Sequence, residues 1–273
     1  RFRQRPGKTI ADECIHMYET YGAKTLYLTD SLTNGNMKEF IEFITHLAEV
    51  KAKRGYKDLQ WTGQYITRPA HQIPHNKDYY PLMGASGAVG LSVGAESGSN
   101  RVLENMRKKM KIEDLFIELD YFQKHGITMV AGILPSYPTE TRDDFELTLK
   151  MLKGFQPYLA NRTIEHIGGI AKWYAQDNHN EWSRKGEEQG WYFNGSDPNI
   201  WWYKHNPELT LQERVFRRVT LSKILVNYDM PSIMDEEYEL KNINNWYVLN
   251  QEKYNEFLNG IVAYNEWKSN AWA

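Results

Sequence analysis

The sequence predicts an α/β fold with a parallel sheet, because short strand-like runs alternate with amphipathic, helix-like segments up to about residue 170. The runs are rich in β-branched and aromatic residues, and the longer segments repeat apolar residues at helical spacing. Polar side chains follow the runs, at the edge where parallel α/β proteins bind ligands. A doubly wound sheet and a partial barrel both fit this alternation.

The predicted strands are KTLYLT, LQWTGQYI, AVGLSVGA, ITMVAGIL and RTIEHIGGI, at residues 24–29, 59–66, 88–95, 127–134 and 162–170. Helices are predicted over 9–21, 37–48, 112–122 and 143–153. Thr9 and Asp12 have capping-box spacing at the start of the first helix. The Pro-, His- and Asn-rich segment between the second and third strands is predicted to be a loop.

Composition and charge exclude several classes of protein. The chain has 273 residues, 41% of them hydrophobic, and its net charge of −2 gives no electrostatic argument for binding nucleic acid or an anionic membrane. No apolar stretch approaches the roughly 18 residues of a membrane helix, and no signal-peptide core follows the basic start. A single cysteine, Cys14, rules out intramolecular disulfides. We therefore expect a cytoplasmic protein.

Five polar residues stand where the predicted strands end: Asp30, Gln64, Glu96, Ser136 and His166. Any one of them can simply mark the end of a strand, but together they predict a ligand site at one edge of the sheet. Four histidines, His71, His75, His166 and His179, have no compact ligand spacing, so no metal site is predicted from them.

Two segments carry the clearest functional signals. In VGAESGSNRVLENMRKK (93–109), a strand ends at Glu96, and Ser97, Gly98 and Ser99 turn into a helix that can hold a polar or anionic ligand. The alternative is that Ser99 only caps that helix. In GITMVAGILPSYPTETRDDF (126–145), a strand meets a proline-broken turn, and Thr141 with Asp144 has capping-box spacing.

Together these segments resemble the radical S-adenosylmethionine (SAM) superfamily. ESGSNRVLENMRKK is similar to the family's Glu-Ser-Gly-Ser strand end and helix, and PTET resembles its Pro-Gly-Glu-Thr turn. YLTDSLTNGN (27–36) resembles its second strand, and RFRQRPGKTIADEC resembles the segment after its Cys-x3-Cys-x2-Cys loop. The resemblance covers roughly residues 1–170 and is nearest to the branch with cobalamin-dependent and methylthiotransferase-like enzymes.

The resemblance implies a partial (β/α)6 TIM-like barrel. It also implies that a [4Fe–4S] cluster on three cysteines cleaves bound SAM to a 5′-deoxyadenosyl radical, with electrons from a donor such as flavodoxin or ferredoxin and with cobalamin as a further cofactor in this branch. Carried over, Glu96, Ser97 and Ser99 would contact the SAM ribose and methionine moiety, Asp30 would face the same ligand, and the 132–138 turn would flank the adenine. The resemblance names no catalytic residue and no substrate.

The chain departs from the family at three places. Ser136 and Thr139 stand where the family has glycine, which is tolerated if their φ angles are negative. No Cys-x3-Cys-x2-Cys loop is present, and one cysteine cannot hold a cluster that needs three thiolates. Since the chain begins at Arg1 and the match begins just after that loop, we expect a fragment that lacks the first strand and the cluster loop, inactive by itself.

Residues 1–170 are therefore predicted to form the barrel, and 171–273 a mainly helical C-terminal extension with helices over 206–228 and 251–267. The extension either covers the substrate or only packs against the barrel. Two alternatives to an enzyme's SAM-binding barrel remain open at this point. One is a non-catalytic barrel that has lost its cluster, and the other is an unrelated α/β-barrel enzyme.

Overall fold

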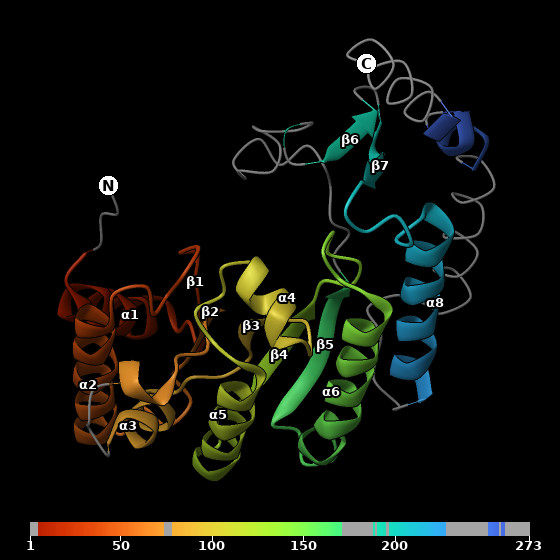
Figure 1. Cartoon of the computed structure of the whole chain (residues 1–273). Coiled ribbons are helices and arrows are strands. Elements are labelled where there is room, and N and C mark those ends of the chain that lie inside the picture. The colour runs from red at the N-terminus through yellow and green to blue at the C-terminus, as the bar shows by residue number, and fades with distance from the viewer. Residues whose placement is uncertain are drawn as a thin grey trace. The chain divides into compact units, whose positions relative to one another are not determined.

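The computed structural model describes residues 5–73, 78–170, 188, 190–194, 197–227, 251–256 and 258–259 (Figure 1). The helices are α1 (Gly7–Tyr21), α2 (Met37–Arg54), η1 (Ala70–Gln72), α3 (Tyr79–Ser86), α4 (Asn100–Asn105), α5 (Ile112–His125), α6 (Arg142–Ala160) and α8 (Leu211–Asn227). The strands are β1 (Thr25–Leu28), β2 (Gln60–Tyr65), β3 (Leu91–Glu96), β4 (Met129–Ile133), β5 (Ile164–Ile170), β6 (Trp191–Asn194) and β7 (Asp197–Tyr203).

Strands β1 to β5 form one sheet in chain order (Figure 1). The pairs β1–β2, β2–β3 and β3–β4 are parallel. The Met129 amide donates to the Thr163 carbonyl at 2.9 Å, so β4 and β5 also start side by side. Because the order never reverses, every right-handed crossover turns the same way and leaves its helix on one face. This order excludes a doubly wound sheet and confirms the predicted partial-barrel class.

The two faces of the sheet differ in composition. One face is apolar and buried, with Trp61 and Tyr65 on β2, Leu91, Val93 and Ala95 on β3, and Met129, Ala131 and Ile133 on β4. Helices cover this face: α1, α2, α3 and α5 pack one against the next, and the rings of Phe40 and Phe43 lie against Trp61. The opposite face is half-buried and rich in polar residues and glycine.

Three sequence-based expectations were wrong in detail. The segment predicted as a loop contains α3, which forms despite Pro81 and Gly84 because Tyr79, Tyr80 and Met83 are buried. Helix α1 begins at Gly7 behind Pro6 with no side-chain cap, so Thr9 and Asp12 form no capping box there. Helix α6 continues beyond residue 153 to Ala160, through Pro157.

The chain divides into two compact units. The first contains residues 1–96, 106–133 and 151–168, and the second contains residues 97–105, 134–150 and 169–273. In the second, β6 and β7 form an antiparallel hairpin whose Trp191, Trp201 and Tyr203 make a core with Leu209. Of the helix expected over 251–267, residues 251–256 and 258–259 are helical and the rest lie outside the described residues, as do His75 and His179.

Candidate ligand-binding site

In the first unit, the half-buried face of the sheet carries polar side chains toward the carboxyl ends of β2 and β3. Thr62 and Gln64 of β2 and Ser92 and Glu96 of β3 alternate with the buried residues. Gln64 lies beside Tyr27 of β1, with 3.4 Å between its Nε2 and the tyrosine hydroxyl. The main-chain carbonyl of Gln64 also accepts a 2.7 Å bond from the Thr33 amide, which ties β2 to the loop after β1.

Glu96 occupies an unusual backbone position at the end of β3. Its φ is 58°, in the left-handed region, and the register with β4 shifts between Gly94 and Glu96. Bulges of this kind redirect a side chain, and left-handed non-glycine residues cluster at ligand sites. The Glu96 carboxylate accepts a 2.8 Å bond from Lys108 Nζ, and the two side chains are 21% and 24% exposed. The carboxylate is thus held by one cation and still reaches solvent.

Two glycines face each other on this half-buried face. Gly94 of β3 pairs with Gly132 of β4. A Cβ placed on Gly132 would come no nearer than 3.7 Å to another atom, so packing does not require glycine there. A Cβ on Gly94 would instead lie 2.2 Å from Glu96 Oε1 and 2.8 Å from Lys108 Nζ. Gly132 therefore leaves bare backbone against which a flat ligand can lie, whereas the side chains of Glu96 and Lys108 cover Gly94.

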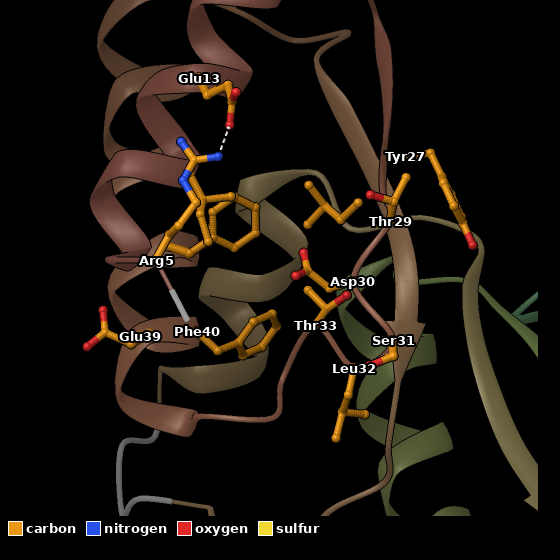
Figure 2. A pocket seen from close by; sticks show the side chains of 13 residues that line it. Arg5, Glu13, Tyr27, Thr29, Asp30, Ser31, Leu32, Thr33, Glu39 and Phe40 are labelled. Carbon is orange, nitrogen blue, oxygen red and sulfur yellow. Dashed lines mark hydrogen bonds and ion pairs between the residues drawn. The ribbon is translucent and has the colours of Figure 1, made fainter. Parts of the chain in front are cut away.

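Asp30 lies in a pocket of about 580 Å³ beside β1. Figure 2 shows Asp30 and Thr33 on the strand side and Arg5, Glu13 and Phe40 on the helix side. Arg5 donates to Glu13 at 2.7 Å. Within the described residues, the buried Thr33 hydroxyl has no hydrogen-bond partner. The pocket therefore combines charged and apolar walls with an unsatisfied hydroxyl, a lining suited to a polar ligand with an apolar part.

In the second unit, Ser97 and Ser99 are buried and hydrogen-bonded. The two hydroxyls of Ser97 and Thr148 lie 3.2 Å apart, and Ser99 Oγ donates to Asp144 at 2.5 Å while it accepts from the Val102 amide at 3.3 Å. The capping role of Ser99 is therefore present in α4. Burial raises the pKa of Asp144, but hydrogen bonds from Arg101, Ser99 and Thr141 outweigh it and hold that pKa at about 2.

Gly98 has a packing reason to be glycine. A Cβ there would lie 2.2 Å from the Leu147 carbonyl oxygen, so only glycine allows the chain to approach α6 this closely. Thr141 and Asp144 form the predicted capping box at the start of α6, since the Thr141 amide donates to Asp144 at 2.9 Å and the Asp144 amide to Thr141 Oγ1 at 3.3 Å.

Ser136 also has a left-handed backbone, with φ 64°. A negative φ, the condition for replacing the family's glycine without strain, is therefore not met at Ser136. It is met at Thr139, which has no positive φ. The Ser136 amide donates to the buried Glu140 carboxylate at 2.6 Å. Burial raises the pKa of Glu140 to about 7, although the nearby charge of Arg217 lowers it. Within the described part of the chain, Ser136 Oγ and Glu140 Oε1 have no hydrogen-bond partner.

Asp30, Gln64 and Glu96 thus come to the same ends of three adjacent strands in the first unit. Ser97, Gly98, Ser99 and Ser136 belong to the second unit, and their convergence with the first three stays a prediction. The sequence analysis assigned no role to Lys108, although this residue lies inside the 93–109 segment that contains the Glu-Ser-Gly-Ser motif. It also missed Arg217, which has no local sequence signal.

The residues of this chain do not fit a [4Fe–4S] cluster. Its one cysteine, Cys14, is buried in α1, and burial raises the pKa of the thiol to about 11. A cluster needs several thiolates. Among the described residues, no three His, Cys, Asp or Glu side chains gather as a metal site would require, and none of the described helices is long and apolar enough to cross a membrane.

No protein family model matches the chain. It is 25% identical over 160 residues to the anaerobic magnesium-protoporphyrin IX monomethyl ester cyclase of Rubrivivax gelatinosus, covering 59% of this chain and 27% of that protein. It is 23% identical over 159 residues to the tRNA-2-methylthio-N(6)-dimethylallyladenosine synthase of Malacoplasma penetrans, covering 56% and 31%. The chain thus spans less than a third of the length of either relative.

Among solved structures, one similar chain is the cobalamin-dependent S-adenosylmethionine radical enzyme OxsB with aqua-cobalamin bound. The TM-score is 0.49 at 16% sequence identity, and the match covers 62% of this chain and 24% of that one.

Proposed function

We propose that this chain, which is related to the radical SAM enzymes, forms the part of such an enzyme that binds SAM. The observation that carries the proposal is Glu96, a carboxylate on a strained bulge at the end of β3, within the Glu-Ser-Gly-Ser motif and on the half-buried polar face. Backbone strain at a residue predicted from sequence to bind a ligand supports a functional role there.

The residues present fit SAM. Glu96 can accept hydrogen bonds from ribose hydroxyls, and a carboxylate such as Asp30 can pair with the ligand's ammonium group. The unsatisfied Ser136 Oγ suits a ligand amine or hydroxyl at the turn expected beside the adenine. Bound SAM supplies the radical chemistry of the family, and these side chains would bind and orient it.

The complete protein would then be a cytoplasmic enzyme that receives electrons from a donor such as flavodoxin or ferredoxin. Cobalamin is a further cofactor that the resemblance supports. Because the chain has a single cysteine, we expect it to bind SAM without cleaving it. The same cysteine count favours a second candidate, a barrel that binds SAM as a non-catalytic module.

Titration calorimetry with SAM tests the proposal on the full chain. Glu96→Gln keeps the shape of the side chain but removes the charge, and we expect it to weaken SAM binding about 10- to 150-fold, or roughly 1.5–3 kcal/mol. Glu49→Gln, an exposed substitution on α2, is the matched control and should leave the affinity unchanged. Equal SAM affinity of wild type and Glu96→Gln would remove the assigned role of Glu96.

The natural sequence upstream of Arg1 separates the two candidates. If that sequence contains a Cys-x3-Cys-x2-Cys loop, and the chain extended by it forms 5′-deoxyadenosine reductively, the enzyme is supported. An upstream sequence without those cysteines, with SAM binding retained, supports the non-catalytic module.

A further inference from the structure

The turn from Ser136 to Glu140 is built around one buried carboxylate in the second unit. Glu140 Oε2 accepts a 2.6 Å bond from the Ser136 amide and a 2.9 Å bond from Arg217 Nη1. The ion pair is almost fully shielded from solvent, since the side chains of Arg217 and Glu140 are 2% and 0% exposed. Ser136 carries a Cβ in the left-handed region, a conformation that persists only where surrounding contacts enforce it.

Two side chains from the C-terminal region also bind the backbone of this turn. Asn206 Nδ2 donates to the carbonyls of Pro138 and Glu140, at 3.0 and 2.8 Å. Arg217 Nη1 donates to the Glu140 carbonyl at 3.1 Å, in addition to its contact with the carboxylate. Both the side chain and the main chain of the turn are therefore fixed by residues more than sixty positions away.

Arg217 is itself held in place within the same unit. Its Nε donates to Glu213 at 2.9 Å, one helical turn earlier on α8, and its guanidinium lies 5.2 Å from the centre of the Phe145 ring. A buried ion pair cannot rearrange without leaving a charge unpaired, so these contacts hold the turn in one conformation.

We propose that Asn206 and Arg217 are positioning residues for SAM, which hold the 136–140 turn in the conformation that receives the adenine side of the ligand. The inference rests on the proposed function. It gives part of the C-terminal region a role in building the ligand site, distinct from covering a substrate. A turn ordered before binding spares the ligand the cost of ordering it.

Two measurements on the full chain test the inference: hydrogen–deuterium exchange of the 134–141 peptide without ligand, and the affinity for SAM by calorimetry. Arg217→Met removes the charge and its hydrogen bonds while it retains packing on Phe145. We expect faster exchange of the turn and SAM binding weaker by about 10-fold or more, because the ligand must then bear the cost of ordering the turn. Lys223→Met removes a charge from an exposed position of α8 and should change neither quantity.

Rescue separates positioning from a general loss of stability. Arg217→Met leaves Glu140 buried and unpaired, so the double variant Arg217→Met/Glu140→Gln, which has no buried charge, should recover stability. It should recover neither the turn's protection nor the SAM affinity, because the bonds from the guanidinium to the turn are still missing; full recovery of both would contradict the positioning role. Asn206→Leu leaves no unpaired charge behind, and it provides a second test if Arg217→Met does not fold.

The outcomes are distinct. Normal SAM binding by a variant whose turn exchanges faster would overturn the positioning role and leave the proposed function standing, as would unchanged exchange in both Arg217→Met and Asn206→Leu. A wild-type chain that does not bind SAM contradicts the proposed function. The exchange data then decide by themselves whether Arg217 and Asn206 order the turn.

Discussion

At the scale of single residues, three carboxylates show how environment separates roles. Glu96 is partly exposed and paired with Lys108 on the polar face. Glu140 is buried against Arg217. Glu118, on α5, is buried and accepts hydrogen bonds from the hydroxyls of Tyr65 at 2.7 Å and Tyr80 at 3.4 Å. Of these, Glu96 is the one placed to meet a ligand, and the other two hold structure.

Glu118 makes the stability of the first unit depend on pH. Burial raises the pKa of Glu118 from 4.5 to about 7, although hydrogen bonds from Tyr65 and Tyr80 lower it. Below pH 4.5 the group is protonated in both the folded and unfolded states. As the pH rises to 7, Glu118 ionises first in the unfolded chain, so the free energy of unfolding falls by about 3 kcal/mol over that range.

We therefore predict that Glu118→Gln removes this loss, because glutamine keeps the hydrogen-bond acceptor for Tyr65 and carries no charge. The measurement is the free energy of unfolding in urea at several values between pH 4.5 and 8. Relative to wild type, the variant should gain stability as the pH rises, whereas Glu49→Gln should follow the wild-type curve. A constant difference between Glu118→Gln and wild type would show that Glu118 titrates normally.

At the scale of elements, substitution of two glycines by alanine should have opposite effects on stability. Gly98→Ala places a Cβ 2.2 Å from a main-chain oxygen of α6, which cannot move away without shifting the helix. We expect a loss of stability of about 1–3 kcal/mol, typical of overpacking, measured as a lower unfolding midpoint. Gly132→Ala meets no atom nearer than 3.7 Å and should fold normally.

The Gly132→Ala variant has a second use, because its methyl group would cover the open backbone at Gly132. If SAM lies against that backbone, Gly132→Ala should bind it more weakly than wild type while unfolding at the same temperature. Unchanged affinity would move the ligand away from this part of the sheet. Equal stability of Gly98→Ala and wild type would contradict the packing reason given for Gly98.

The sequence was sufficient to predict the strands of the sheet because their short β-rich runs are separated by clear helical periods. It missed α3, whose sequence YYPLMGAS carries weak helix propensity and which forms through tertiary burial. Strand ends revealed Asp30, Gln64 and Glu96, since parallel topology fixes their common edge. The same criterion was wrong for His166, which lies inside β5 (Ile164–Ile170) and not at its carboxyl end. Arg217 was missed because its partner Glu140 lies 77 positions away and no periodicity connects them.

At the scale of the whole molecule, the edge of the sheet is the feature with consequences in solution. In the described part of the chain, β1 has a strand neighbour on one side only, which is β2. Its residues are exposed or half-buried, and Tyr27 is 57% exposed. An uncovered edge offers free backbone hydrogen-bonding groups to another strand, so such edges promote association between copies.

We predict that the chain associates as its concentration rises and that Tyr27→Lys shifts it toward the monomer, because a lysine on an edge strand opposes pairing with a second copy. Light scattering coupled to size-exclusion chromatography, over about a tenfold range of concentration, measures the mass. Ile117→Lys is the control: this residue is 49% exposed on α5, away from the edge, and its substitution should leave the association unchanged. A monomer at every concentration, or equal association of wild type and Tyr27→Lys, would show that the β1 edge is not the contact between copies.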